Sequence, residues 1–201
     1  MSNNPYKRAD HWSQRARKEG FPARSVYKLE EIVARAPVLT RGARVVDLGC
    51  TPGSWSRYCA LTCGPDARIV GIDINDPPSY PGVFLRGSID DIPAEVVQEA
   101  LGGPADVVLS DMAPPTTGDR MGDHLRQISL AESALALALR LLRPGGSFVV
   151  KVFDGSDAPA FTKAVGARFG KVRRMKPDAV RSSSVEFYLV ATELQRAADA
   201  P

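Results

Sequence analysis

The feature that most constrains the fold is a regular alternation of strand-like and helix-like segments from residue 43 onward. Alternation of this kind is typical of a doubly wound α/β sheet in which most strands are parallel. The predicted strands are residues 44–48, 68–73, 83–85, 106–110, 147–153, 171–175 and 186–192. The predicted helices are residues 23–35, 54–62, 93–101, 127–142 and 158–169.

The boundaries of the folded unit follow from the same pattern. The predicted helix that ends at Leu142 is followed by the turn-forming sequence Arg-Pro-Gly-Gly at residues 143–146. The last two strands are joined by a short turn region at residues 176–179, so we expect them to pair antiparallel. With 201 residues and 44% apolar content, the chain is long enough for one well-buried core. We therefore expect a basic arm over residues 1–22, one domain over residues 23–193 and a frayed tail over residues 194–201.

Composition argues against several classes of protein. The N-terminus is polar and basic, and the longest apolar helical patch is far too short to cross a bilayer, so we expect neither a secretory signal nor a membrane segment. The cysteines Cys50, Cys59 and Cys63 form no CxxC pair, and their odd number argues against a disulfide framework. His11 and His124 are isolated, which argues against a metal site. We expect a cytoplasmic monomer with no bound metal.

The charge of the chain is unevenly distributed. The net charge is +3, but residues 1–28 carry +5 and residues 163–181 carry +6, which leaves −8 for the remainder. Two basic segments on an acidic body suggest a polyanionic partner, and the alternative is that each segment is only a solvated surface. Aromatic side chains interleave with the first segment, at Tyr6, Trp12, Phe21 and Tyr27. Because aromatic rings stack on unpaired bases while cations meet phosphates, the combination favours RNA.

Three charged residues lie on segments that otherwise predict buried strands. Lys151 lies within the apolar run 146–153, Asp111 closely follows the run 107–109, and Glu186 lies among apolar residues of the last strand. A bare charge in such a place carries a large desolvation cost unless a partner or a cleft accepts it. The carboxyl ends of neighbouring parallel strands meet at one edge of a sheet. We therefore expect the side chains of Asp111 and Lys151 to meet there and to form part of a functional site.

A glycine turn between the first strand and the next helix predicts a cofactor site. Gly49 and Gly53 leave room for a ligand close to the backbone, and Asp47 before the turn can accept a hydrogen bond from a loop amide or, through water, from a ligand ammonium. The spacing is not GxGxxG, which argues against a dehydrogenase. Asp73 ends the next strand, where a carboxylate can bind the hydroxyls of an unphosphorylated ribose. An adenosine ligand with a cationic or zwitterionic tail fits better than NADP, unless the turn only packs a helix on the sheet.

Several motifs, in order along the chain, resemble the FtsJ/RrmJ family of S-adenosylmethionine-dependent RNA 2′-O-methyltransferases. They lie at residues 11–12, 18–21, 24–32, 47–55, 110–114, 145–153 and 185–191. The resemblance runs from about residue 5 to residue 192 and is specific only in combination. It implies a single Rossmann-like methyltransferase domain whose last strand is antiparallel, with S-adenosylmethionine as the cofactor.

The resemblance also implies roles for particular residues. The family's Lys-Asp-Lys-Glu tetrad falls on Lys28, Asp111, Lys151 and Glu186, with Lys151 nearest the chemistry. By composition alone Lys28 is typical of an exposed helical lysine. Glu186 could instead pair with a nearby arginine at the strand end, and Asp111 could cap the loop that follows it.

The family's cofactor-contacting positions are matched by Gly53, Trp55, Asp73 and Asp111. One position departs from the family pattern. An aspartate is common after the third strand, near the adenine, and this chain has Ser88 there. Ser88 can donate and accept one hydrogen bond, and Asp90 or Asp91 could substitute for the missing carboxylate.

The protonation state of Lys151 stays open at this point. A desolvated lysine near a second cation, Lys28, has a lowered pKa and could take the proton of a ribose hydroxyl. Asp111 and Glu186 act in the opposite direction and favour an ammonium, which would orient the hydroxyl. We expect Lys151 to be the base, with Asp111 tuning and orienting it.

The compact form and short basic arm most resemble the bacterial enzymes that act on a uridine of 23S rRNA within the 50S subunit. Three alternatives remain. A tRNA 2′-O-methyltransferase would share the tetrad. A small-molecule O-methyltransferase would share the glycine turn but would not need the basic segments. A non-catalytic RNA-binding factor would tolerate the loss of Lys151.

Overall fold

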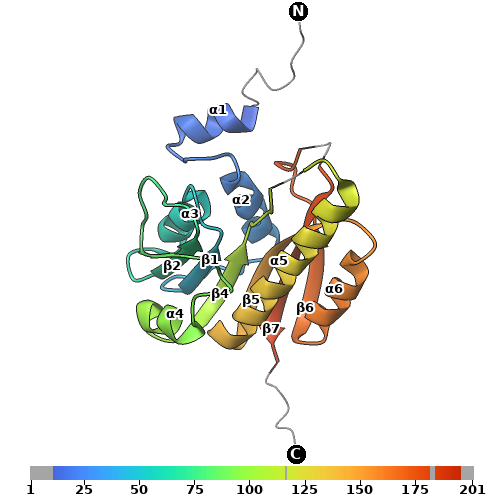
Figure 1. Ribbon diagram of the computed structural model, residues 1–201. Helices are drawn as coiled ribbons and strands as arrows, with labels where there is room; N and C mark the ends of the chain where they lie inside the picture. Colours follow the sequence, from blue (N-terminus) through green and yellow to red (C-terminus); the bar gives the residue numbers. More distant parts are fainter. Residues whose placement is uncertain (1–10, 116, 182–183, 196–201) are drawn as a thin grey trace, which may run out of the picture.

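A single mostly parallel sheet forms the centre of the molecule (Figure 1). The strands are β1 (Arg44–Leu48), β2 (Arg68–Asp73), β3 (Val83–Arg86), β4 (Ala105–Ser110), β5 (Leu142–Phe153), β6 (Phe169–Met175) and β7 (Glu186–Leu194). The computed structural model describes residues 11–115, 117–181 and 184–195, and within them the seven strands lie in the order β3-β2-β1-β4-β5-β7-β6. β7 is antiparallel to both of its neighbours, and the other pairs are parallel. The predicted fold class is confirmed.

Helices cover both faces of the sheet. They are α1 (His11–Lys18), α2 (Val26–Arg35), α3 (Ser54–Cys63), α4 (Ala94–Leu101), α5 (Arg120–Leu141) and α6 (Ala158–Gly166). On one face α2 and α3 bury Leu29, Ile32 and Cys59 against β1 and β4, and on the other face α4, α5 and α6 build a second core. None of the helices in the described residues is both long and apolar enough to cross a membrane.

The order of the strands reverses between β1 and β4. β1 leads outward through β2 to β3, whereas β4 leads in the other direction to β5. Leu48 at the end of β1 pairs with Ser110 at the end of β4. Ligands of open parallel sheets bind outside the carboxyl ends of the strands at such a reversal. The fold therefore brings the glycine turn after β1 next to Asp111 after β4.

The N-terminal helix α1 was not predicted. Residues 1–22 were expected to form a basic arm; residues 1–10 lie outside the described part of the chain, and residues 11–18 are helical. α1 packs through Ala16 in a small cluster with Tyr27 and Ala179, and the guanidinium of Arg15 lies 4.2 Å from the centre of the Tyr27 ring. The first helical turn has no acidic residue and the segment is short, so local signals for a helix are weak.

The start of α5 was placed too late in the sequence. The helix was predicted from Gln127, but it begins at Arg120, and the carboxylate of Asp119 caps it by accepting a hydrogen bond from the Met121 N–H. Gly122 and polar neighbours weaken the apolar periodicity of the first two turns. The capping aspartate is the local signal that could have located this helix start.

Two strand boundaries also differ from the prediction. The predicted break at residues 143–146 lies inside β5, as an irregularity where pairing with β4 shifts register between Leu142 and Ser147. β7 extends to Leu194, which is buried and pairs with Phe169, so the tail expected from residue 194 does not begin there. Residues 196–201 of that tail lie outside the described residues.

The connection between β6 and β7 is longer than the short turn that was predicted. It lies between Met175 and Glu186, and of its described residues Asp178 contacts α2. The N–H of Asp178 donates to Glu31 at 2.6 Å, and Arg24 donates to the carbonyl of Ala179 at 3.1 Å. Burial of Ala179 and Val180 ties this connection to the core, beside the carboxyl end of the sheet.

Candidate functional site

Lys151 and Asp111 meet at the carboxyl ends of β5 and β4, as the sequence predicts. Nζ of Lys151 donates to the backbone carbonyl of Asp111 at 2.5 Å and lies 3.2 Å from Oδ1 of the same residue. Lys151 is only 6% exposed. The cost of burying its charge is offset by these two acceptors, which explains how a lysine is tolerated in a buried strand.

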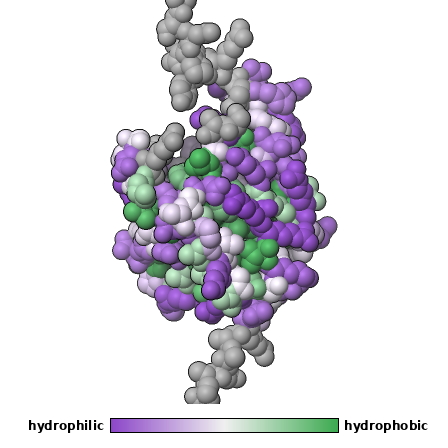
Figure 2. All heavy atoms as spheres, turned by 90° about the vertical axis from the view of Figure 1, so that its right-hand side faces the viewer, coloured by the Kyte–Doolittle hydropathy of each residue, from purple (hydrophilic) through white to green (hydrophobic). Residues whose placement is uncertain are grey.

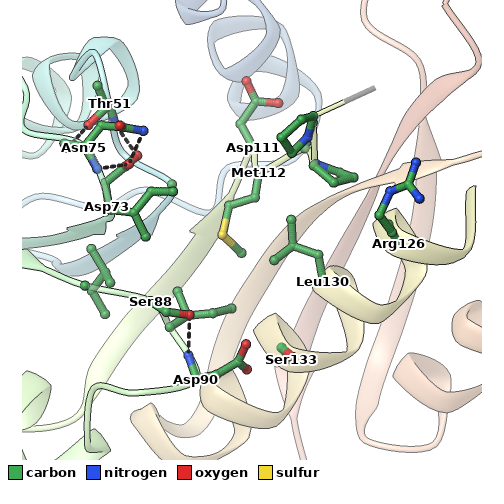
Figure 3. A pocket seen from close by; sticks show the side chains of 18 of the residues that line it. Thr51, Asp73, Asn75, Ser88, Asp90, Asp111, Met112, Arg126, Leu130 and Ser133 are labelled. Carbon is green, nitrogen blue, oxygen red and sulfur yellow. Dashed lines mark hydrogen bonds between the residues drawn. The ribbon is translucent and has the colours of Figure 1, made fainter. Parts of the chain in front are cut away.

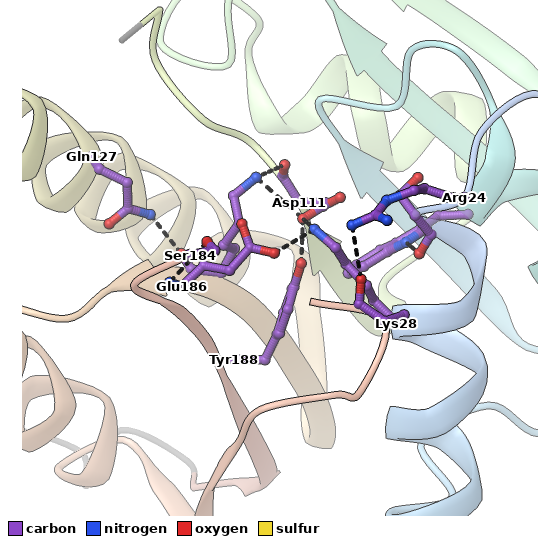
Figure 4. A network of polar contacts seen from close by, with 11 residues as sticks. Arg24, Lys28, Asp111, Gln127, Ser184, Glu186 and Tyr188 are labelled. Atoms are coloured by element: carbon purple, nitrogen blue, oxygen red, sulfur yellow. Dashed lines mark hydrogen bonds and ion pairs between the residues drawn. The ribbon is translucent and has the colours of Figure 1, made fainter. Parts of the chain in front are cut away.

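Lys28 and Glu186 complete a four-residue network with this pair (Figure 4). Nζ of Lys28 lies 2.5 Å from Oε1 of Glu186 and 3.9 Å from Oδ1 of Asp111. Lys28 is 9% exposed, so it is not the surface lysine that its local sequence suggests. Packing of α2 against the sheet places it there, and Glu186 pairs with Lys28 in preference to a nearby arginine. The structure thus brings together all four residues that the resemblance assigned to the tetrad.

Tyr188 is a member of this network that the sequence reasoning missed. Its hydroxyl donates to Oδ1 of Asp111 at 2.5 Å, and its ring lies 5.8 Å from Nζ of Lys28. Burial, followed by the negative charges of Asp111 and Glu186, raises the pKa of the phenol well above its usual value. Tyr188 is therefore a neutral donor that fixes the Asp111 carboxylate. The signal in the sequence is its position two residues after Glu186, on the same face of β7.

A cavity of about 550 Å³ opens beside this network at the reversal of strand order. Figure 3 shows Asp73 and Ser88 on one side, residues of α5 on the other, and Met112 between them. Asp111 lines the cavity and also belongs to the four-residue network. The cavity and the network are therefore adjacent parts of one site.

Asp73 holds the position predicted for a ribose-binding carboxylate. Its two oxygens accept the backbone N–H groups of Thr51 at 2.9 Å and Asn75 at 2.8 Å. A carboxylate has about four acceptor positions, so Asp73 keeps capacity for ligand hydroxyls. Ser88 and Asp90 also line the cavity, and the N–H of Asp90 donates to the Ser88 hydroxyl at 3.3 Å.

Two positions of the turn after β1 require glycine, because of their positive φ angles and because a Cβ would lie close to neighbouring atoms. Gly49 has φ of 72°, and a Cβ at this residue would lie 2.3 Å from Cγ of Met112. Gly53 has φ of 99° at the start of α3, where a Cβ would lie 3.3 Å from the carbonyl of Ser79. Gly49 lines the cavity, whereas Gly53 is not among the described residues that line it. Both glycines thus have a structural role whatever the ligand.

Neither Asp47 nor Trp55 is among the described residues that line the cavity. Asp47 is fully buried and accepts a hydrogen bond from the Ser56 hydroxyl at 2.5 Å. Burial raises the pKa of Asp47 to about 7, against the lowering effect of Ser56. The indole N–H of Trp55 donates to the carbonyl of Ser25 at 2.8 Å, which ties α3 to the start of α2. The contacts of both residues are therefore with the protein itself, which gives each a structural role whatever the ligand.

The loop between β4 and α5 is held in place by Asp123. Its carboxylate accepts the N–H groups of Thr117 at 2.9 Å and Gly118 at 3.1 Å, and it pairs with Arg126. Arg126 lines the cavity from the α5 side (Figure 3). Among the described residues, no group of three or more His, Cys, Asp or Glu side chains is arranged to hold a metal ion.

The two basic segments approach each other at the carboxyl end of the sheet. Arg24 of the first segment donates to the carbonyl of Ala179 in the second segment. Arg174, also of the second segment, pairs with Asp154 at 2.7 Å, and its guanidinium lies 3.8 Å from the ring centre of Phe187. Figure 2 faces the side of the molecule that carries β6 and α6, where hydrophilic side chains predominate. Lys171 lies near the start of β6, toward the other end of the sheet, so the second segment is only partly beside the site.

Comparison with known proteins agrees with this geometry. The family model for FtsJ-like methyltransferases matches residues 21–194. Ribosomal RNA large subunit methyltransferase E of Desulfatibacillum aliphaticivorans is 46% identical over 184 residues, which cover 90% of this chain and 88% of the relative. The protein of the same name from Myxococcus xanthus (strain DK1622) is 39% identical over 201 residues, 98% of this chain and 94% of the relative.

Solved structures give the same result. A protein from Plasmodium falciparum, provisionally named a ribosomal RNA methyltransferase, superposes with a TM-score of 0.78 at 28% identity. The match covers 87% of this chain and 98% of that one. Because the family model spans most of the sequence and relatives are similar over nearly their whole length, the chain belongs to the FtsJ-like methyltransferase family.

Proposed function

We propose that this protein transfers a methyl group from S-adenosylmethionine to a ribose 2′-hydroxyl of 23S ribosomal RNA. The observation that carries the proposal is the network of Lys28, Asp111, Lys151 and Glu186 at the rim of the cavity. A buried lysine beside a ligand-sized cavity is typical of a site that moves a proton.

The cavity fits S-adenosylmethionine in size and charge. Its volume of about 550 Å³ lies within the range of small-molecule sites. Among its described lining residues, Asp73, Asp90 and Asp111 are acidic and Arg126 is basic, with Arg126 already paired to Asp123. An acidic lining favours a ligand with a sulfonium and an ammonium group. Asp73 would hold the ribose hydroxyls, and Ser88 with Asp90 would lie near the base.

S-adenosylmethionine supplies a methyl group that is activated by a positively charged sulfur. Nζ of Lys151 donates a hydrogen bond to the carbonyl oxygen of Asp111 and forms an ion pair with Oδ1 of the same residue. Once its ammonium group has released a proton to solvent, Lys151 keeps two hydrogens for these two oxygens, and its lone pair can take the proton of the ribose hydroxyl. When the methyl group moves from the sulfur to the ribose oxygen, this proton would pass to Lys151.

The remaining residues orient this base. Tyr188 and Lys28 both contact the Asp111 carboxylate, and Glu186 balances the charge of Lys28. Asp111 in turn directs Nζ of Lys151 from two sides. The protein thus contributes orientation and electrostatic preorganisation, which account for a large part of the rate of such reactions.

The choice of acceptor rests on the relatives. Curated relatives are named Ribosomal RNA large subunit methyltransferase E, which supports 23S rRNA as the substrate. From the motif resemblance we further propose that the target is a uridine, presented by the assembled 50S subunit in the cytoplasm. The basic segments at the carboxyl end of the sheet would meet the RNA phosphates. We propose that the enzyme acts as a monomer.

The test is transfer of labelled methyl from S-adenosylmethionine to three acceptors: 50S subunits, protein-free rRNA and tRNA. The proposal expects label on the 50S subunit, mapped to a ribose 2′-oxygen. Label on tRNA alone would mean that the substrate is tRNA and not rRNA, while the proposed reaction would stand. Tight binding of S-adenosylmethionine with no label on any of the three would contradict the proposal and favour a small-molecule enzyme.

A further inference from the structure

Gln127 on α5 bonds the backbone of β5 on both sides of Val152. Its Nε2 donates to the carbonyl of Lys151 at 2.7 Å, and its Oε1 accepts the N–H of Phe153 at 2.9 Å. The side chain is only 1% exposed. Figure 4 shows its amide pointing from the helix toward the strand that carries the tetrad lysine. A buried glutamine whose amide oxygen and nitrogen both bond one strand is a specific arrangement, because each unpaired buried polar group costs free energy.

These backbone groups need a partner because β4 ends two residues short of the position opposite Val152. β4 pairs with β5 only as far as Ser110, which faces Val150. The next residue, Asp111, turns out of the sheet and uses its carbonyl to accept Nζ of Lys151. In a parallel ladder, a further β4 residue opposite Val152 would donate to the Lys151 carbonyl and accept from the Phe153 N–H. The carboxamide of Gln127 supplies the same donor and acceptor, so it replaces the backbone N–H and C=O of one β4 residue.

We propose that Gln127 is a positioning residue that fixes the backbone of Lys151, and through it the catalytic amine. This inference rests on the proposed role of Lys151 as the base. Departure of β4 gives Asp111 its place in the site, but it leaves the strand beneath Lys151 without a neighbour on that side. Gln127 removes this conflict. Gln127 fixes the backbone carbonyl of Lys151, and Asp111 fixes its Nζ. Lys151 is therefore held both at its backbone and at the end of its side chain.

The test is the substitution Gln127→Met, which keeps the length of the side chain and removes both hydrogen bonds. We expect kcat to fall about ten- to a hundred-fold, since small misplacements of a reacting group carry penalties of this size. Binding of S-adenosylmethionine should change by less than about two-fold, because the cavity wall is untouched. The Phe153 amide, having lost its acceptor, should exchange with solvent faster.

Leu137→Ala is the matched control. Leu137 is a buried core residue further along the same helix, roughly 15 Å from Gln127 along the helix axis. Its truncation should lower the melting temperature while kcat stays within about two-fold of the wild type. If Gln127→Met retains wild-type kcat, or loses no more than Leu137→Ala at equal loss of stability, the inference is wrong.

Two further variants keep the result interpretable. If Gln127→Met does not fold, the substitution Gln127→Glu is measured in its place. A protonated glutamic acid can donate and accept a hydrogen bond like the amide, so the ratio of the variant's kcat to that of the wild type should fall as the pH rises. A ratio that stays constant below one over this pH range would overturn the inference. Lys151→Met separates this inference from the proposed function. Loss of activity in Lys151→Met with full activity in Gln127→Met overturns only the role of Gln127, whereas an active Lys151→Met overturns both.

Discussion

Lys151 donates to the backbone carbonyl of Asp111 at 2.5 Å while its Nζ lies 3.2 Å from the Asp111 carboxylate. A single residue therefore directs the amine from two sides. This arrangement depends on β4 leaving the sheet at Asp111, directly beside the start of the cavity. The end of one strand thus determines where the base, its orienting carboxylate and the cofactor cavity meet.

Asp73→Ala should weaken the binding of S-adenosylmethionine by about ten- to a hundred-fold. The substitution removes the carboxylate proposed to hold the ribose hydroxyls, and hydrogen bonds to charged groups contribute about 1.5–3 kcal/mol. Isothermal titration calorimetry measures the change. Asp76→Ala is the control, because Asp76 lies three residues further on, pairs with Arg86 at 3.0 Å, and is not a lining residue of the cavity. Equal affinity in the two variants would remove Asp73 from the cofactor site.

Asp47→Asn should stabilise the protein at pH 8 and have little effect near pH 4. Burial raises the folded-state pKa of Asp47 from 3.8 to about 7. A raised pKa means that the folded state holds a proton that the unfolded state has lost, so stability declines as the pH rises from about 4 to 7. Asparagine is neutral at every pH in this range, so the substitution removes this decline in the free energy of unfolding, which is on the order of a few kcal/mol. Denaturant unfolding at several pH values measures it.

Asp106→Asn provides the contrast of opposite sign. Burial opposes a lower pKa at Asp106, but the Arg44 N–H and the Arg143 guanidinium outweigh it and lower the pKa. Its contribution to stability is present at neutral pH and is lost as the pH falls through the folded-state pKa, so Asp106→Asn should destabilise at pH 7. A similar pH profile for the two variants would contradict the assignment at Asp47.

Replacing Arg173 and Arg174 together by glutamine should weaken RNA binding and flatten its dependence on salt. Each phosphate contact contributes about 0.7–0.9 to the slope of log K against log salt, so the slope should fall by up to about 1.5. The control is the pair Arg140→Gln and Arg143→Gln, at the other end of the sheet, whose arginines are also ion-paired. An unchanged slope in the β6 variant would make the second basic segment a solvated surface.

The sequence predicts the topology well because the topology depends on local patterns. Apolar runs and glycine turns locate the strands. The predicted antiparallel pairing of β6 and β7 is confirmed, although their connection is longer than the predicted turn. Boundaries are harder where local signals are weak. Gly122 interrupts the apolar pattern of α5, and the turn sequence at residues 143–146 hides the continuity of β5.

The candidate site was predictable only in part. Asp111 and Lys151 stand out because each is a charge beside or within an apolar run, and parallel strands bring such residues to one edge. Lys28 has no such signal: its burial depends on how α2 packs, and its partner Glu186 is far away in the chain. Gln127 and Tyr188 were missed for a similar reason. Their importance comes from backbone and carboxylate groups that only the folded structure places beside them.

The most direct test of the account is the single-turnover rate of methyl transfer by Lys151→Met, with the product mapped at the ribose 2′-oxygen. Arg140→Met, which changes an exposed basic residue in the last turn of α5 at the other end of the sheet, is the control. The account predicts that Lys151→Met slows transfer by about 10²- to 10⁴-fold, while affinity for S-adenosylmethionine stays within a few-fold. Transfer by Lys151→Met at the rate of the Arg140→Met control would show that Lys151 is not the base, and would contradict the account.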